Sequence, residues 1–197
     1  MHVEKRGKSL LSRFTHDAKH YSFSLPKQKK TFTIPELQAI LIAFANHSQY
    51  YHYTNFVIFL VSTSCRFGEA AGLRWKHLAA DFSTVWIGEI ISRGHQNQKG
   101  TKTGKSRTIQ LPPGGRSMLA DKFDRLKPQS DDLVFPSPKG LAIDDRRFRA
   151  RAWKKILASC KIEYRVPYNL RHSGISHALY EGANPIALAE QTTNRTR

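Results

Sequence analysis

The sequence is poor in cysteine and in long hydrophobic runs. Its 197 residues include two cysteines, Cys65 and Cys160, which lie far apart and lack the paired spacing of a zinc site or a disulfide framework. The opening MHVEKRGKSLLSRF has no apolar stretch long enough for a signal peptide, and no run approaches the roughly 20 apolar residues of a membrane-spanning helix. We therefore expect a soluble protein of the cytoplasm, without membrane partners.

A metal centre is also disfavoured. The close histidine pairs are His16/His20, His47/His52 and His172/His177. None of these pairs matches the HExxH motif, in which a glutamate follows the first histidine. The densest acidic residues are Asp131, Asp132, Asp144 and Asp145, which fall in turns or at a helix start. A metal-dependent nuclease, which needs clustered carboxylates, is thus the most distant of the functions that we consider.

Acidic residues are scarce beside basic ones, with 15 Asp and Glu against 32 Lys and Arg, and the net charge is +17. Residues 1–30 hold eight basic and two acidic residues, residues 31–90 three and four, and residues 91–197 hold 21 and nine. A near-neutral block followed by a basic half indicates a structural core that carries a charged functional surface. Such a field points to a polyanionic partner, although charge that only keeps the protein soluble is the simpler alternative.

The hydrophobic pattern of the first half predicts helices. Residues 1–30 are basic and weakly periodic, so we interpret them as a linker or as the remnant of a preceding domain. In TFTIPELQAILIAF, Thr33 and Glu36 predict a capping box. The positions expected on the buried face of this helix are Leu37, Ile40, Leu41 and Phe44. YTNFVIFLVSTS is apolar on nearly all sides and predicts a central buried helix, followed by a helical stretch in FGEAAGLRWKHL.

In the second half of the chain the hydrophobic pattern changes from the helical period to the alternation of strands. STVWIGEIIS and SRTIQLP alternate and are β-branched, and the polar RGHQNQKGTKTGK between them predicts a small antiparallel sheet with a mobile loop. SMLADKFDRL and DDRRFRARAWKKILASC predict two further helices. The second of these should bury Phe148, Ala152, Ile156 and Leu157 and expose Arg146, Arg147, Arg149, Arg151, Lys154 and Lys155. The predicted fold class is α+β and mainly α-helical, with a small antiparallel sheet packed beside a helical core.

Three basic residues stand at element ends or in turns, where functional residues concentrate: Arg66, Lys102 and Arg171. Arg66 directly follows the buried helix, so its guanidinium needs a partner, which Glu69 can supply. Taken alone, a structural salt bridge is the simpler interpretation. Together, however, two arginines can grip one phosphate while a lysine donates a proton, and these are the requirements of phosphoryl transfer.

Three stretches resemble, in order and spacing, the landmarks of the tyrosine recombinases, or phage-integrase family. They are TSCRFGEAAGLRW, the hairpin before SRTIQLP with Lys102, and LRHSGISHAL. The resemblance covers approximately residues 31–194. It implies a catalytic domain that binds duplex DNA, attacks a phosphodiester with a tyrosine, and rejoins strands through a 3′-phosphotyrosine. It implies no metal and no nucleotide cofactor. Family members assemble on DNA as oligomers, and a monomer in solution is compatible with this fragment.

The resemblance also implies roles for individual residues. Arg66 and Arg171 would bind the phosphate, and Lys102 would protonate the leaving 5′ oxygen. Glu69 matches the acidic residue one turn after the first arginine. His172 would support the site from behind, although an ordinary hydrogen-bonded core histidine is an equal alternative.

The chain departs from the family pattern at two site positions. Tyr168 stands where the family usually has a histidine, and Asn194, with Thr193, aligns with its usual Gly-His or Gly-Trp pair. A phenol can donate to a phosphate oxygen but is a poor base near neutral pH. The family's nucleophilic tyrosine would lie beyond Arg197. We therefore expect residues 31–197 to be a catalytic domain without its C-terminal segment, which forms no covalent complex with DNA on its own.

Two functions remain open. One is the DNA-binding catalytic domain of a site-specific recombinase, and the other is a catalytically inactive DNA-binding remnant of such an enzyme. In both cases residues 1–30 would be a basic linker or the remnant of an N-terminal DNA-binding domain. The residues expected to contact double-stranded DNA are Lys105, Arg107, Arg146, Arg147, Arg149 and Arg151.

Overall fold

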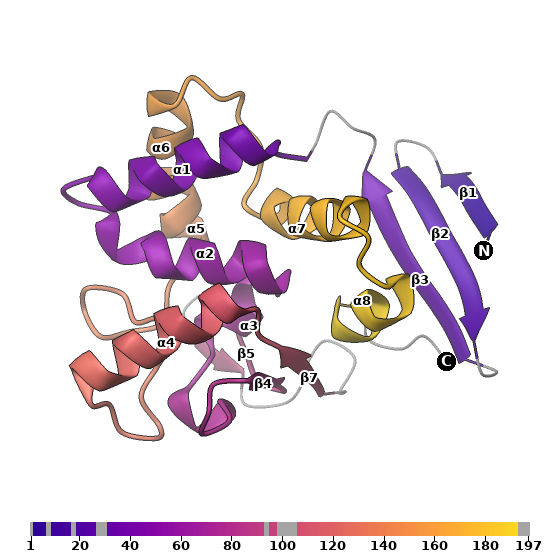
Figure 1. Ribbon diagram of the computed structural model, residues 1–197. Coiled ribbons are helices and arrows are strands. Elements are labelled where there is room, and N and C mark those ends of the chain that lie inside the picture. Colours follow the sequence, from indigo (N-terminus) through magenta and orange to yellow (C-terminus); the bar gives the residue numbers. More distant parts are fainter. Residues whose placement is uncertain are drawn as a thin grey trace.

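The computed structural model describes residues 2–6, 9–16, 19–26, 31–92, 95–97 and 106–192. For the strands before residue 27, for Ser92 and for residues 95–97 it describes the backbone alone. Helices surround a central helix, α2, and a small sheet lies at one end of this helical body (Figure 1). None of the helices within these ranges combines the length and the apolar character that a membrane crossing requires.

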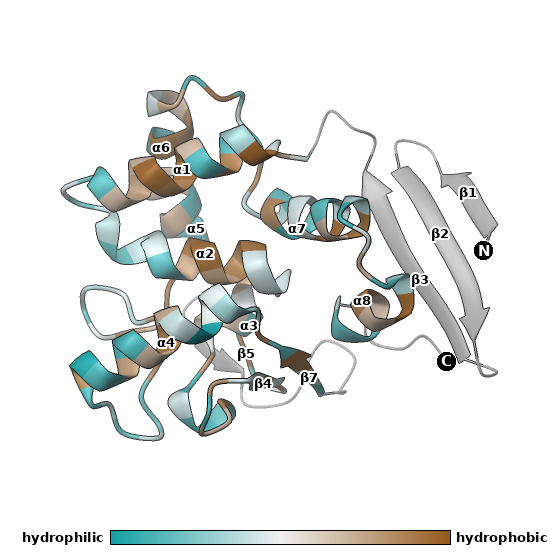
Figure 2. Cartoon of the chain, in the orientation of Figure 1, coloured by the Kyte–Doolittle hydropathy of each residue, from teal (hydrophilic) through white to brown (hydrophobic). Residues whose placement is uncertain are grey.

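Helix α1 (Ile34–Asn46) begins with the predicted capping box. The hydroxyl of Thr33 accepts from the backbone N–H of Glu36 at 3.3 Å, and the Glu36 carboxylate accepts from the Thr33 N–H at 2.8 Å. Helix α2 (Thr54–Thr63) follows the 3₁₀ turn η2 (Tyr51–Tyr53) and is the buried central helix that the sequence predicts. The middle of α2 is brown in Figure 2, because apolar residues lie around most of its circumference there, whereas its first and last residues are polar and paler.

Helix α3 (Phe67–Ala71) is much shorter than the helical stretch expected there. It ends at Gly72, and the 3₁₀ turn η3 (Trp75–His77) follows. Close packing explains part of the local sequence, because a Cβ on Gly68 would lie 2.6 Å from the carbonyl oxygen of Ile91. Glycine at this position lets α3 approach strand β5 (Ile90–Ser92).

The predicted small antiparallel sheet is confirmed. Strand β4 (Thr84–Ile87) pairs antiparallel with β7 (Arg107–Gln110), and Val85 lies opposite Ile109 in the core. Strand β5 pairs antiparallel with β6 (His95–Asn97). Residues 98–105, between β6 and β7, lie outside the described residues.

Helix α4 (Pro113–Leu126) is mostly hydrophilic (Figure 2). The basic helix predicted near residue 150 consists of α5 (Asp145–Arg147), a π-helical segment η4 (Phe148–Trp153) and α6 (Lys154–Ser159). Its buried and exposed faces are those predicted. The buried positions are Phe148, Ala152, Ile156 and Leu157, and the exposed ones are Arg146, Arg147, Arg149, Arg151, Lys154 and Lys155.

The start of the helical body is tied to helix α7 (Tyr168–Tyr180). Phe32 is fully buried, its N–H donates to the hydroxyl of Ser173 at 2.7 Å, and its carbonyl oxygen lies 2.7 Å from Nε2 of His177. Helix α8 (Pro185–Thr192) follows α7 after a short turn. The chain therefore enters the helical body against the helix that carries Arg171.

Residues before this point form a three-stranded antiparallel sheet of β1 (His2–Arg6), β2 (Ser9–His16) and β3 (Lys19–Pro26). Strand β3 lies beside α7 and α8 (Figure 1). The weak periodicity of this stretch did not predict strands, because their pairing depends on the register between neighbours. The interpretation of residues 1–30 as a linker or domain remnant stays a prediction.

Candidate active site

Arg66 stands at the junction of α2 and α3. Ser64 caps α2 in the left-handed conformation, with φ of 53°, and this turn redirects the chain so that Arg66 becomes the N-terminal cap residue of α3. The side chain of Arg66 is 35% exposed. The arginine therefore leaves the core at its edge, as the sequence predicts, and part of its guanidinium faces solvent.

Glu69 is the acidic partner of Arg66 and is fully buried. Its Oε1 accepts from Nη1 of Arg66 at 2.8 Å, and its Oε2 accepts from the Arg66 backbone N–H at 2.9 Å. A second arginine, Arg107 from β7, binds the same carboxylate with both terminal nitrogens, at 3.0 Å and 2.6 Å. One carboxylate thus joins two arginines from different elements.

The charge on Glu69 is stabilised by these contacts. Burial raises its pKa, but the hydrogen bonds and charge of Arg107, together with the bonds from Arg66, outweigh burial and hold the pKa at about 2. The carboxylate is therefore ionised at neutral pH. This makes Glu69 a group that holds arginines in place, not one that transfers protons.

Arg107 was predicted to contact DNA, and its partnership with Glu69 was missed. Its side chain is 7% exposed, and its Nε donates to the backbone carbonyl of Gln191 at 2.7 Å. The alternation of β7 contained the signal, since Arg107 lies two residues before the buried Ile109 and shares its face of the strand. An arginine on an inward face needs a buried acceptor, and Glu69 provides it.

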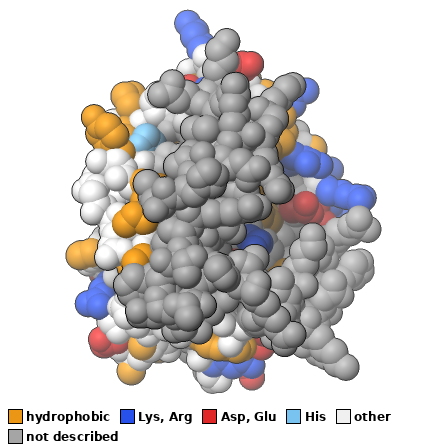
Figure 3. Space-filling model, turned by 90° about the vertical axis from the view of Figure 1, so that its right-hand side faces the viewer, with side chains coloured by type: hydrophobic (Ala, Val, Ile, Leu, Met, Phe, Trp, Pro, Cys, Tyr) orange, Lys and Arg blue, Asp and Glu red, His pale blue; other side chains and the backbone are white. Residues whose placement is uncertain are grey.

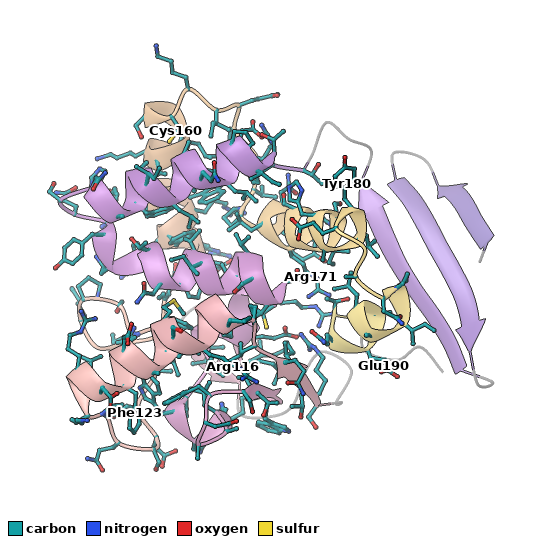
Figure 4. The ribbon with its side chains drawn as sticks, viewed as in Figure 1. Arg116, Phe123, Cys160, Arg171, Tyr180 and Glu190 are labelled. Carbon is teal, nitrogen blue, oxygen red and sulfur yellow. The ribbon has the colours of Figure 1, made fainter. Side chains whose placement is uncertain are left out.

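Arg171 lies in the first turns of α7 and is 6% exposed. Its Nη1 donates to the carbonyl of Ser64 and its Nη2 to the carbonyl of Thr192, so one guanidinium links the ends of α2 and α8. Figure 4 shows Arg171 directed from α7 toward α8. Burial lowers its pKa, Tyr168 raises it, and the nearby charge of Arg66 lowers it further. The two arginines are therefore electrostatic neighbours.

A close contact between helices explains this geometry. A Cβ on Gly174 would lie 2.4 Å from the carbonyl oxygen of Val61 and 2.6 Å from the hydroxyl of Ser64. Glycine therefore allows α7 to pack directly against the end of α2. This approach brings the Arg171 guanidinium to the Ser64 carbonyl, two residues before Arg66.

The aromatic candidates lie at different ends of α7. Tyr168, at its first residue, is 48% exposed, and its ring meets that of His172 edge-on with centroids 4.8 Å apart. Tyr180, at its last residue, is 91% exposed and lies at the far end of the helix (Figure 4). Tyr168 is thus the phenol that stands on the same end of α7 as Arg171.

The structure brings Arg66, Glu69 and Arg171 together around one region, with Tyr168 and His172 on the same helix as Arg171. Three predicted residues, Lys102, Lys105 and Asn194, lie outside the described residues. Viewed from the right-hand side of Figure 1, Lys and Arg side chains lie along the margins of the described part of the surface (Figure 3). The described ranges contain no group of three or more His, Cys, Asp or Glu arranged to hold a metal ion.

The fold is shared with catalytic domains of integrases and recombinases. The Tn1549 transposon integrase, in complex with circular intermediate DNA, matches with a TM-score of 0.68 and 18% identity, over 86% of this chain and 59% of that one. The catalytic domain of bacteriophage HP1 integrase matches with a TM-score of 0.60 and 17% identity, over 85% and 82%. XerH site-specific recombinase, bound to its difH substrate, matches with a TM-score of 0.61 and 19% identity, over 85% and 47%.

The family model for the phage integrase family matches residues 30–193. This chain therefore belongs to the phage integrase family, as its three sequence landmarks indicated. It spans about three fifths of the length of the Tn1549 integrase chain. No curated protein sequence matches it.

Proposed function

We propose that this chain is the DNA-binding catalytic domain of a site-specific tyrosine recombinase. The observation that carries the proposal is the junction of α2, α3, α7 and α8, where Arg66 and Arg171 are held as electrostatic neighbours around the buried Glu69. Two like charges repel, and keeping them together with only one carboxylate leaves a positive site suited to an anion. Membership of the phage integrase family supports a DNA phosphate as that anion.

In this proposal Arg66 and Arg171 neutralise the scissile phosphate as charge develops on its oxygens. Tyr168 donates from its phenol to a phosphate oxygen in the position of the usual histidine, and His172 supports α7 beside it. Arginine is suited to this task because its planar fork can bind two oxygens of one phosphate.

The proposal extends to two residues outside the described ranges. Lys102 would protonate the leaving 5′ oxygen, and Asn194 would act as a further hydrogen-bond donor to the phosphate. Neither role requires a metal ion or a nucleotide cofactor. Because the proposed substrate is duplex DNA, we further propose that the protein acts inside the cell.

The exposed face of α5, η4 and α6 would track the DNA backbone. Its arginines are exposed along a single helical segment, so they can meet successive phosphates. The residues on this face proposed to contact DNA are Arg146, Arg147, Arg149 and Arg151, and Lys105 is proposed to join them from outside the described ranges. Arg107 faces the core and is proposed to act through Glu69 instead.

A binding titration tests the proposal. The affinity for a short duplex DNA should fall steeply between low and moderate salt, and Arg66→Gln should weaken the binding of inorganic phosphate. Binding that ignores salt, or phosphate binding that does not change in Arg66→Gln, contradicts the proposal.

A second experiment asks whether this chain attacks DNA itself. A nicked suicide substrate traps a phosphotyrosine on denaturing gels, and mass spectrometry locates it. We expect no adduct, because the Tyr168 ring packs edge-on against His172, its phenol is proposed as a donor to the phosphate, and Tyr180 lies at the far end of α7. An adduct mapped to either tyrosine would reassign the nucleophile.

A further inference from the structure

Arg107 is bonded to three acceptors that belong to two other elements. Both oxygens of the Glu69 carboxylate, on α3, accept from its terminal nitrogens, and the carbonyl of Gln191, near the end of α8, accepts from its Nε. Its own strand, β7, begins with this residue. One guanidinium therefore joins β7, α3 and α8 at the candidate active site.

Arg107 and Arg66 share the Glu69 carboxylate unequally. Arg107 binds the carboxylate with a two-pronged fork at 2.6 Å and 3.0 Å, whereas the side chain of Arg66 reaches it through Nη1 alone, at 2.8 Å. The Arg107 side chain is 7% exposed and that of Arg66 is 35% exposed. The buried arginine thus takes the larger share of the carboxylate, and the exposed arginine keeps part of its fork toward solvent.

The alternative arrangement shows why this matters. Without a second cation, a buried carboxylate would draw the Arg66 fork onto both of its oxygens, because a buried charge requires neutralisation. Arg66 would then be an ordinary ion pair with little net charge to offer a phosphate. With Arg107 present, one negative charge is shared by two positive ones, and the pair retains a net positive charge.

We propose that Arg107 is a positioning residue that neutralises Glu69 and so keeps the guanidinium of Arg66 available to a phosphate. The inference rests on the proposed function, because it gives Arg66 a phosphate to bind. It also assigns Glu69 a definite task, which is to orient Arg66 through one nitrogen without cancelling its charge.

The proposal predicts that a second substitution, at Glu69, restores the phosphate affinity that is lost on removing Arg107. Arg107→Gln leaves Glu69 to neutralise Arg66, so phosphate affinity should fall roughly five- to tenfold, as expected for removing a neighbouring charge in a partly buried site. Glu69→Gln combined with Arg107→Gln removes both charges, so the affinity should return to within about twofold of the wild type. Arg125→Gln, on the exposed end of α4, is the matched control for losing one arginine and should change it by less than about twofold.

The measurement is a titration of the full chain with inorganic phosphate, followed through the Nε–Hε signals of its arginines by NMR. Arg66 and Arg171 signals should shift together in the wild type. A double variant as weak as Arg107→Gln, or an Arg107→Gln affinity equal to that of the wild type, overturns the inference. Wild-type signals for Arg66 and Arg171 that ignore phosphate would instead defeat the proposed function, so the two failures are distinguishable.

Arg107→Lys covers the case in which Arg107→Gln does not fold. Lysine keeps the charge and loses the fork, so charge neutralisation predicts a phosphate affinity within about twofold of the wild type even where the melting temperature falls. A loss in Arg107→Lys beyond fivefold would mean that the shape of the fork, and not its charge, maintains the site, and would overturn the neutralisation proposed here.

Discussion

The arginines of this protein fall into two groups with opposite surroundings. Arg107 and Arg171 are 7% and 6% exposed, and each donates to acceptors on two other elements. The arginines on the α5–η4–α6 face, at positions 146, 147, 149 and 151, are all exposed to solvent. The first group has lost its water and depends on fixed protein partners, whereas the second keeps its water until a partner arrives.

This contrast separates two uses of one side chain. A buried arginine determines where elements meet, so its removal should cost stability. An exposed arginine contributes to the long-range field, so its removal should cost affinity for a polyanion and little else. The net charge of +17 combines both groups and does not by itself distinguish them.

The largest effect should follow from removing a buried arginine. Arg171→Met leaves the carbonyls of Ser64 and Thr192 without their donor, and we expect a loss of about 4 kcal/mol in the free energy of unfolding. Arg149→Met, on the exposed face, is the control and should change it by less than about 0.5 kcal/mol. Denaturant titration of both variants measures the difference, and equal losses would erase the distinction between the groups.

The next largest effect should come from acid, which protonates Glu69, the carboxylate that neutralises the buried Arg107. The pKa of Glu69 is held at about 2 in the folded protein against an ordinary 4.5, so its contribution is fully present above pH 4.5 and is lost as the pH falls through 2. The contribution amounts to about 3 kcal/mol. The unfolding free energies of the wild type and Glu69→Gln, measured from pH 5 downward, should converge. Parallel curves would show that the carboxylate carries no such stabilisation.

The exposed group should respond through affinity. Changing Arg146, Arg147, Arg149 and Arg151 together to Gln should weaken duplex binding about a hundredfold at low salt and lower the slope of log K against log salt by about three to four. The unfolding free energy should stay within about 1 kcal/mol of the wild type. An unchanged salt slope would place the DNA on another face.

The smallest effect concerns Lys122, whose burial is intermediate between those of the two groups of arginines. Lys122 lies partly buried on α4 with its ammonium 5.0 Å from the centre of the Phe135 ring, and burial, then the charge of Arg125, lowers its pKa to about 8. Lys122→Met should therefore stabilise the protein by about 1 kcal/mol at neutral pH. The gain should shrink as the pH rises from 8 toward 10.5, because the wild-type lysine then loses its charge on folding. A destabilised variant would mean that the contact with Phe135 outweighs burial.

Much of the fold could be predicted from local pattern. The capping box of α1, the buried α2, the β4–β7 sheet and the two faces of the basic helix depend on periodicity and on neighbouring residues, which a sequence displays directly. The short length of α3 and the strands β1–β3 were not predicted. Both depend on contacts with other elements, such as the approach of Gly68 to Ile91.

The site shows the same division. The motifs identified Arg66, Glu69 and Arg171, and the structure brings them together. The pairing of Arg107 with Glu69 could not be predicted, because 38 residues separate them and only the fold makes them partners. Whether Arg107 also contacts DNA stays a prediction. The roles of Lys102 and Asn194 stay predictions.

The hydrogen bonds of the Phe32 backbone have a consequence for the order in which the protein folds. They reach 141 and 145 residues along the chain, to Ser173 and His177, and the Arg171 guanidinium donates to the carbonyl of Thr192. Contacts that span so much of the chain form late, because a long loop must close before they contribute. On the ribosome, helices α1 to α6 can be made while the anion site is still open. The Arg171–Thr192 bond forms only when α8 emerges, so the proposed phosphate site is incomplete in the nascent chain until the last described helix is in place.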